Sequence, residues 1–124
     1  VENLPDLWNE EFLKILRLDV NDDKSGCLQD IHWYGGDFGY FPTYSIGAFI
    51  AAQLASKVRQ EIIDFDLNLE AGNFKPIIKW LRENFHSKGN FLKIDELLTE
   101  STEEKLNLKY FENHIIGRYI KKEI

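Results

Sequence analysis

The chain has 124 residues, of which 44% are hydrophobic and 14% aromatic, so it suits one globular domain and argues against disorder. Its formal net charge is −6 and its one basic cluster is Lys121-Lys122, which excludes a nucleic-acid surface because such a surface needs a basic patch. No apolar run approaches the roughly 18 residues of a membrane helix, so we expect no membrane partner.

Hydrophobic spacing predicts the first helix near residues 6–18, with Asp6 as its N-cap after Pro5. The polar residues 19–26 have the composition of a loop. Residues 26–44 hold four glycines among many aromatic and polar side chains. We therefore expect an irregular Gly/Tyr-rich loop at about 26–44, with a single turn at 28–32.

The second helix is predicted to begin after Pro42, with Thr43 as a cap, and to run to about Leu67. Its apolar face has helical spacing and consists of Ile46, Phe49, Ile50, Leu54, Val58, Ile62 and Phe65. Small residues cover much of the rest of its first half, which suits close packing on more than one neighbour.

The remaining segments are also helical in pattern. After a turn at 68–72, Asn73 is the predicted cap of a third helix that Gly89 ends. A short helix is predicted at 94–98. Residues 101–104 read S-T-E-E, which has the form of a capping box and is predicted to open a last helix reaching Tyr119. No segment has strand periodicity, so the predicted class is all-α.

The histidines do not form a metal site in sequence. A peptidase zinc site needs two histidines at i and i+4 on one helix with a glutamate between them. His32, His86 and His114 are far apart, and Cys27 with His32 makes only one pair. We therefore expect no metal ligands and no bound cofactor in this chain.

Polar side chains in the 26–44 loop offer a different chemistry. Gln29, Asp30 and His32 place hydrogen-bond donors and acceptors on one short turn. Asp30 can orient an imidazole, such as that of His32, and keep it ready to donate to an oxyanion.

The glycines and tyrosines of the loop can serve either ligand binding or the local fold. Gly36 and Gly39 permit unusual dihedral angles and a close approach of ligand to backbone. Tyr40 and Tyr44 carry phenolic donors that can hydrogen-bond the tetrahedral oxyanion of an attacked peptide bond. The structural alternative is a buried polar turn that caps the second helix, with the aromatic residues as core. The residues alone weigh these two interpretations equally.

Residues 26–33 read G-x-x-Q-D-x-H-W, and this string resembles the C-terminal part of the carboxypeptidase Taq family of thermostable zinc metallocarboxypeptidases. The resemblance continues in G-x-F-G-Y-F-P-T-Y at 36–44 and A-A-Q-L at 51–54. It is present upstream in L-P-x-L-W-N at 4–9 and is looser after residue 70. The S-T-E-E cap departs from the Thr-Gly-Glu type of sequence expected there.

The resemblance implies the C-terminal segment, residues 1–124, of a large and almost wholly helical enzyme. Members of the family remove C-terminal residues from peptides with zinc or cobalt, held by H-E-x-x-H and a later glutamate. Those ligands would lie in an N-terminal catalytic part that this chain lacks. The implied partners are that missing part, a peptide substrate and, as a possible homodimer, a second copy.

The same resemblance implies a role for the loop as the wall of the cleft opposite the metal. His32, Tyr40 and Tyr44 would contact substrate or stabilise the oxyanion. The residues that would hold the wall in shape are Gln29, Asp30, Trp33, Gly36 and Gly39.

The function predicted from the sequence is therefore part of a metallocarboxypeptidase, inactive as an isolated chain. The alternative is a stand-alone helical binding or assembly module without catalysis, and an accidental motif match is a remote third. The chain has no methionine, so we expect Val1 to follow a longer chain rather than a start codon. A single cysteine and no visible signal peptide suggest the cytoplasm.

Overall fold

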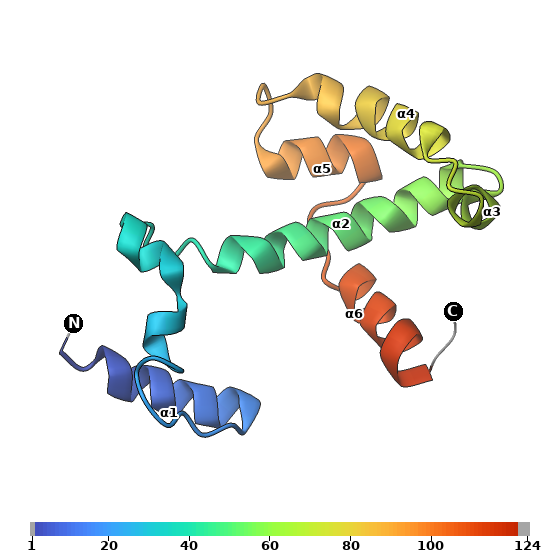
Figure 1. Cartoon of the computed structure of the whole chain (residues 1–124). Coiled ribbons are helices and arrows are strands. Elements are labelled where there is room, and N and C mark those ends of the chain that lie inside the picture. Colours follow the sequence, from blue (N-terminus) through green and yellow to red (C-terminus); the bar gives the residue numbers. More distant parts are fainter. Residues whose placement is uncertain (1, 122–124) are drawn as a thin grey trace. The chain divides into compact units, whose positions relative to one another are not determined.

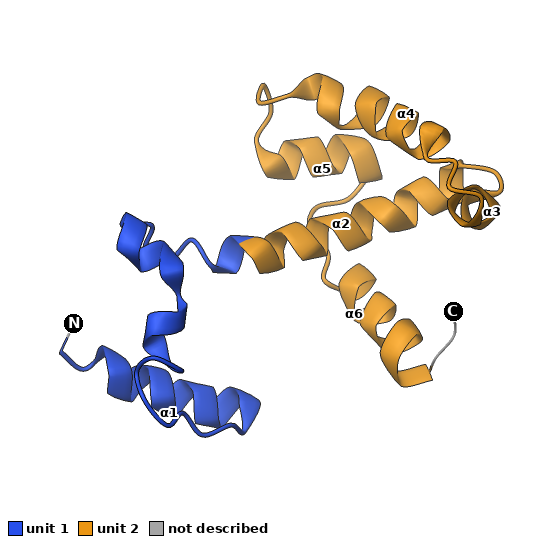
Figure 2. Ribbon diagram, viewed as in Figure 1, with its two compact units in different colours: residues 1–43 blue, residues 44–124 orange. Residues whose placement is uncertain are grey.

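A computed structural model describes residues 2–121, and every regular element in that range is a helix (Figure 1). The predicted all-α class is confirmed. None of the described helices is long and apolar enough to cross a membrane. The chain divides into two compact units, unit 1 up to Thr43 and unit 2 from Tyr44 (Figure 2). Each unit is described by itself.

Unit 1 opens with helix α1, Leu4–Leu16. The predicted start at residue 6 and the predicted cap Asp6 are wrong, because Pro5 and Asp6 both lie in the first turn. Proline has no N–H to lose there, and an acidic side chain interacts favourably with the helix dipole. The helix ends at Arg17, which adopts a left-handed conformation with φ 59°.

The expected irregular loop is more ordered than its composition suggests. It contains two 3-10 helices, η1 (Cys27–Gln29) and η2 (Ile31–Gly35), and its last residues already belong to α2. The single turn predicted at 28–32 is thus two turns, separated at Asp30. Gly36 ends η2 at φ 81°, a value that favours glycine.

Gly26 has a packing role in unit 1. A Cβ built there would lie 2.6 Å from Val20 Cγ1, 3.1 Å from the Asp22 carbonyl oxygen and 3.3 Å from Asn9 Oδ1. The first two neighbours belong to the 19–25 loop and the third to α1. The motif therefore needs glycine at this position so that η1, the loop and α1 can pack closely.

We expect Gly26→Ala to destabilise unit 1 by about 1–3 kcal/mol, the usual cost of overpacking. Hydrogen exchange of the amides of residues 28–36 measures this local change. Gly47→Ala is the matched control, since a Cβ there meets no atom within 4 Å and alanine favours a helix interior. Equal protection in Gly26→Ala and the parent chain would contradict the packing role.

Unit 2 is built on helix α2, Pro42–Glu61, whose first two residues belong to unit 1. The elements that follow are α3 (Phe65–Glu70), α4 (Lys75–Asn84), η3 (His86–Lys88), α5 (Ile94–Thr102), α6 (Lys109–Ile115) and the π-helical turn η4 (Ile116–Lys121). The buried core joins α2, α3 and α4 through Leu54, Val58, Phe65 and Trp80. Leu54, Val58 and Phe65 come from the apolar face predicted for the second helix, and Ile50 and Ile62 of that face pack against the core.

Several predicted helix boundaries in unit 2 are wrong. The second helix stops at Glu61 rather than near Leu67, because Asp64 adopts φ 58° and a separate helix α3 begins after it. Asn68, predicted in a turn, lies in α3, and its side chain donates to the Asp64 carbonyl at 2.9 Å. The third helix starts at Lys75 with Phe74 rather than Asn73 at its N-cap.

The predicted capping box at 101–104 is also wrong. Ser101 and Thr102 are buried at the end of α5, and the chain reverses at Glu103 with φ 66°. Their hydroxyls donate to backbone carbonyls, Ser101 to Asn84 at 2.6 Å and Thr102 to Leu98 at 2.8 Å. The Thr102 bond runs back within α5 and the Ser101 bond ties α5 to α4, so these residues close α5 instead of opening α6.

A charged network links α2 to its neighbours in unit 2. Glu61 accepts from Trp80 Nε1 of α4 at 2.5 Å, and Lys57 Nζ lies 3.2 Å from Glu61 and 3.0 Å from Glu103. The bond from Trp80, followed by that from Lys57, holds the pKa of Glu61 below its ordinary value. The bonds to Glu103 and then Glu61 raise the pKa of Lys57.

Acid is therefore expected to weaken unit 2. A carboxylate whose pKa is lower in the folded state stabilises fully above its unfolded pKa, and loses that effect as the pH falls through the folded value. Because solvent screens the half-exposed Glu61, we expect acid to lower the free energy of unfolding by only about 0.5–1 kcal/mol through this group. Urea unfolding at a series of pH values should show a smaller acid loss in Glu61→Gln than in the surface control Glu70→Gln. If the free energy of unfolding fell equally with pH in both variants, Glu61 would have no such role.

Candidate functional site

The candidate site lies in unit 1 and centres on Asp30 and His32, which flank the start of η2. The carboxylate Oδ1 of Asp30 accepts the backbone N–H of His32 at 3.1 Å and lies 2.6 Å from His32 Nδ1. Asp30 is only 5% exposed and the imidazole is largely buried. Asp30 thus acts both as the N-cap of η2 and as the orienting partner of the ring, as the sequence suggested.

Aromatic rings enclose the imidazole within the same segment. The Tyr40 ring lies 5.0 Å from the His32 ring at an interplanar angle of 35°, and the Phe41 ring meets it edge-on at 5.5 Å. The turn at 36–39 carries the chain back so that these rings reach His32. Two of the three predicted catalytic side chains, His32 and Tyr40, therefore lie together.

The predicted supporting residues hold this segment from several sides. Trp33 packs edge-on against Trp8 of α1 at 5.9 Å and stacks on Phe38 at 6.5 Å. The Gln29 side chain donates to the carbonyl of Lys24. Both contacts tie η1 and η2 to the rest of unit 1.

The glycines of the loop serve its conformation. Gly36 and Gly39 adopt φ 81° and 76°, which other residues rarely adopt. A Cβ at either position meets nothing within 4 Å, so the requirement is conformational rather than steric. A role in the close approach of ligand stays a prediction.

Tyr44 belongs to unit 2. It lies in the first turn of α2 and is 60% exposed. Its predicted role beside His32 stays a prediction.

The described residues do not fit a metal. Within 2–121, no group of three or more His, Cys, Asp and Glu side chains lies close enough together to hold an ion. We therefore assign no step through a metal to these residues.

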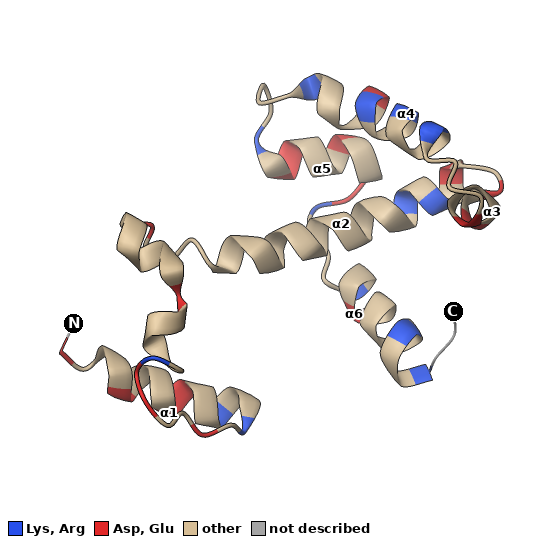
Figure 3. Cartoon of the chain, viewed as in Figure 1, with Lys and Arg blue, Asp and Glu red and all other residues tan. Residues whose placement is uncertain are grey.

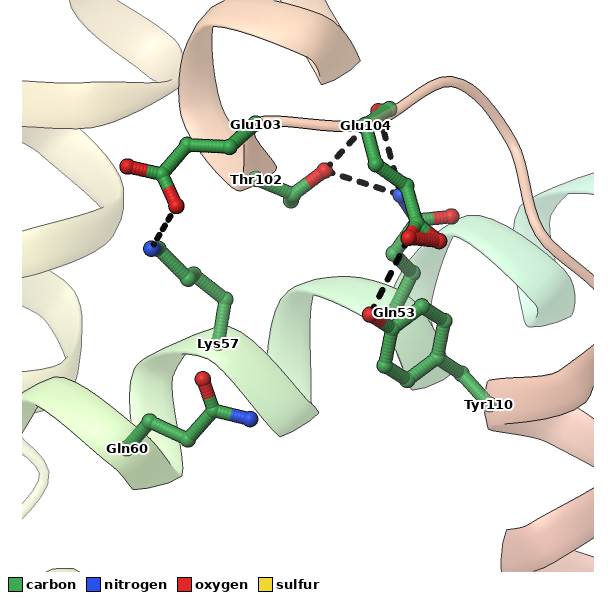
Figure 4. Close-up of a pocket in the computed structure, with 7 residues that line it drawn as sticks. All are labelled: Gln53, Lys57, Gln60, Thr102, Glu103, Glu104 and Tyr110. Carbon is green, nitrogen blue, oxygen red and sulfur yellow. Dashed lines mark hydrogen bonds and ion pairs between the residues drawn. The ribbon is translucent and has the colours of Figure 1, made fainter.

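A second polar feature, which the sequence analysis did not single out, lies in unit 2 (Figure 4). A cavity of about 250 Å³ is lined by Gln53, Lys57, Gln60, Thr102, Glu103, Glu104 and Tyr110. Gln53 is fully buried, and its amide nitrogen lies 2.8 Å from Thr102 Oγ1. An amide inside an otherwise apolar helix face was the signal for it. Because these groups bond one another, the feature holds the fold and offers no catalytic arrangement.

Several known proteins are similar to this chain in sequence and in structure. Carboxypeptidase 1 of Bacillus subtilis is 42% identical over 119 residues, covering 96% of this chain and 24% of that protein. Thermostable carboxypeptidase 1 of Pyrococcus furiosus is 37% identical with the same coverage of both. The solved structure of Trypanosoma cruzi metallocarboxypeptidase 1 has 44% identity and a TM-score of 0.88, covering 95% of this chain and 25% of that one.

The chain thus spans about a quarter of the length of the relatives it matches. A second solved structure, a Pyrococcus furiosus carboxypeptidase, has a TM-score of 0.90 with 37% identity. The family model described as carboxypeptidase Taq (M32) metallopeptidase matches residues 1–119, which include the whole candidate site. The chain therefore belongs to the carboxypeptidase Taq (M32) family of metallopeptidases.

Proposed function

We propose that this chain is the C-terminal part of a metal-dependent carboxypeptidase and forms the substrate and oxyanion wall of its cleft. The observation that carries the proposal is the Asp30–His32–Tyr40 cluster, which lies inside the segment that the family model matches. Such a wall needs fixed donors, because preorganised donors stabilise developing charge better than mobile ones. The buried carboxylate and the packed rings supply that rigidity.

In this proposal the side chains divide the work. The Tyr40 hydroxyl donates to the oxygen of the attacked peptide bond, and His32 acts beside it, with Tyr44 as a further donor. Zinc or cobalt, held by the part of the enzyme that this chain lacks, would supply the hydrolytic chemistry. The isolated chain is then inactive, and the complete enzyme is a cytoplasmic homodimer.

The surface of α2 supports a larger parent fold. Residues 42–56 contain no charged side chain, and the first half of α2 is correspondingly uncoloured in Figure 3. Ile46 in this stretch is 44% exposed. Large exposed apolar surfaces mark sites where another protein segment packs. In the proposal, the missing part of the enzyme covers this face.

A chimera tests the proposal. The matched quarter of Bacillus subtilis carboxypeptidase 1 is replaced by this chain, and release of C-terminal residues from a peptide is measured with and without added metal. We expect the chimera to be active and the 124-residue chain alone to be inactive. A folded, metal-loaded chimera without activity, or an active isolated chain, would contradict the proposal.

A further inference from the structure

The contact between Asp30 and His32 determines which ring nitrogen carries the proton. Asp30 Oδ1 lies 2.6 Å from Nδ1 and accepts the backbone N–H of the same residue at 3.1 Å. Oδ1 is thus an acceptor, and an ionised carboxylate has no donor to offer. With Asp30 ionised, the nitrogen that faces it is N–H, so Nδ1 holds a proton whether the ring is neutral or charged.

This placement restricts what the other nitrogen can do. A neutral imidazole has one N–H, and here Nδ1 carries it, so Nε2 has a lone pair and accepts. A lone pair opposes a developing oxyanion. Only the imidazolium has a proton on Nε2 and can donate to that oxygen. The phenol of Tyr40, in contrast, is a donor in its neutral form.

We propose that His32 is the proton-controlled half of the oxyanion wall. It donates to substrate only as the imidazolium, whose positive charge the buried carboxylate of Asp30 holds in place, and Asp30 is therefore a positioning residue. This inference rests on the proposed function and adds a regulation to it. Asp30 and Tyr40 are titratable groups of unit 1 that face the ring, and Phe41 adds an apolar edge.

The proton position can be measured on the 124-residue chain without any enzyme activity. Histidines labelled with nitrogen-15 give a pyrrole-like shift for a protonated ring nitrogen and a pyridine-like shift for one with a lone pair. We expect neutral His32 to show a pyrrole-like Nδ1 and a pyridine-like Nε2. His86, exposed on η3, is the internal reference and should favour the opposite tautomer, as imidazole side chains do in water.

The wild-type spectrum decides this step. A pyrrole-like Nε2 on neutral His32 would overturn the inference. In Asp30→Ala the neutral ring should shift toward the opposite tautomer, and the indole signal of Trp33 reports whether η2 is still folded. If that variant does not fold, the wild-type assignment still stands as the test.

The consequence for catalysis is measured in the active chimera. His32→Gln places an amide donor at the position and keeps it a donor at every pH. We expect the ratio of kcat for the parent to kcat for the variant to fall about tenfold per pH unit above the midpoint at which NMR shows His32 losing its proton. The ratio stops falling at the pH above which only the Tyr40 hydroxyl donates to the oxyanion in the parent chimera.

A ratio that stays constant through that midpoint would overturn the inference. An inactive chimera would instead contradict the proposed function. The tautomer seen in the isolated chain would still support or overturn the assignment of protons, so the two failures are distinguishable.

Discussion

Replacing Gln53 by alanine is expected to lower the free energy of unfolding of unit 2 by about 3–5 kcal/mol, the largest effect on stability of any change considered for this chain. The side chain is fully buried and its amide bonds in two directions. Nε2 donates toward Thr102 Oγ1 at 2.8 Å and the Lys105 carbonyl at 3.1 Å, while Oε1 accepts the Asn107 N–H at 2.9 Å. Alanine leaves the Lys105 carbonyl and the Asn107 N–H without the Gln53 amide, while Thr102 Oγ1 keeps its bond to the Leu98 carbonyl at 2.8 Å.

Two further variants separate lost hydrogen bonds from lost volume. Gln53→Glu keeps the shape but turns an oxygen toward the carbonyl of Lys105, so we expect it to destabilise at least as much as Gln53→Ala. Gln60→Ala removes an exposed amide from the same helix and the same cavity wall, and should change stability by under about 0.5 kcal/mol. Urea unfolding followed by near-ultraviolet circular dichroism measures all three.

The outcome that would contradict this role is a Gln53→Glu variant as stable as the parent. Gln53 would then be buried by packing alone, and the segment 102–109 would not depend on its amide. The expected result instead makes Gln53 the link between α2 and the connection from α5 to α6.

The sequence predicted the helices best where apolar spacing was long and regular. The second helix has an apolar residue every three or four positions, and its core members Leu54 and Val58 are buried as expected. Its end was missed because Ile62 and Phe65 continue the same spacing across the break. The break depends on the left-handed conformation of Asp64, for which hydrophobic periodicity carries no signal.

Local motifs were less reliable than periodicity. The S-T-E-E string fits a capping box, yet α5 continues through Ser101 and Thr102, whose hydroxyls donate to Asn84 of α4 and to Leu98 of α5. A short pattern of polar residues can end a helix or begin one, and only the tertiary partners decide. The N-cap residue of the helix that starts at Lys109 is Leu108, which makes no side-chain bond, and Asn107 Oδ1 instead accepts the Lys109 N–H at 3.0 Å.

The contact between Asp30 and His32 could be predicted because the two residues are close along the chain. Asp30 and His32 are two positions apart, and a short 3-10 turn suffices to bring carboxylate and imidazole together. The contact of Tyr40 with His32 depends on the reversal at Gly36 and Gly39, which a glycine-rich stretch allows but does not determine. The amide of Gln53 stands out on an apolar helix face, but its partners could not be predicted, because they lie about fifty positions away along the chain.

Replacing Tyr40 by phenylalanine is expected to reduce kcat of the active chimera by about 10²–10³-fold, the usual loss when one oxyanion donor is removed. The substitution removes only the hydroxyl and keeps the ring that contacts His32 at 5.0 Å, so the fold of unit 1 should remain. KM should change little, because the donor acts on charge that develops in the transition state. Peptide hydrolysis at saturating substrate measures this.

His32→Phe should give a loss of similar size at a pH where the imidazole is charged, but it also leaves the buried Asp30 without its side-chain partner. Its fold therefore has to be checked alongside. Tyr34→Phe is the matched control, since Tyr34 lies in η2 and is 71% exposed, and its hydroxyl has no place in the proposed wall. A loss below about threefold at both Tyr40 and His32 would remove the oxyanion role. A large loss of kcat in Tyr40→Phe with none in Tyr34→Phe would instead show that turnover depends on the Tyr40 hydroxyl, which lies beside Asp30 and His32.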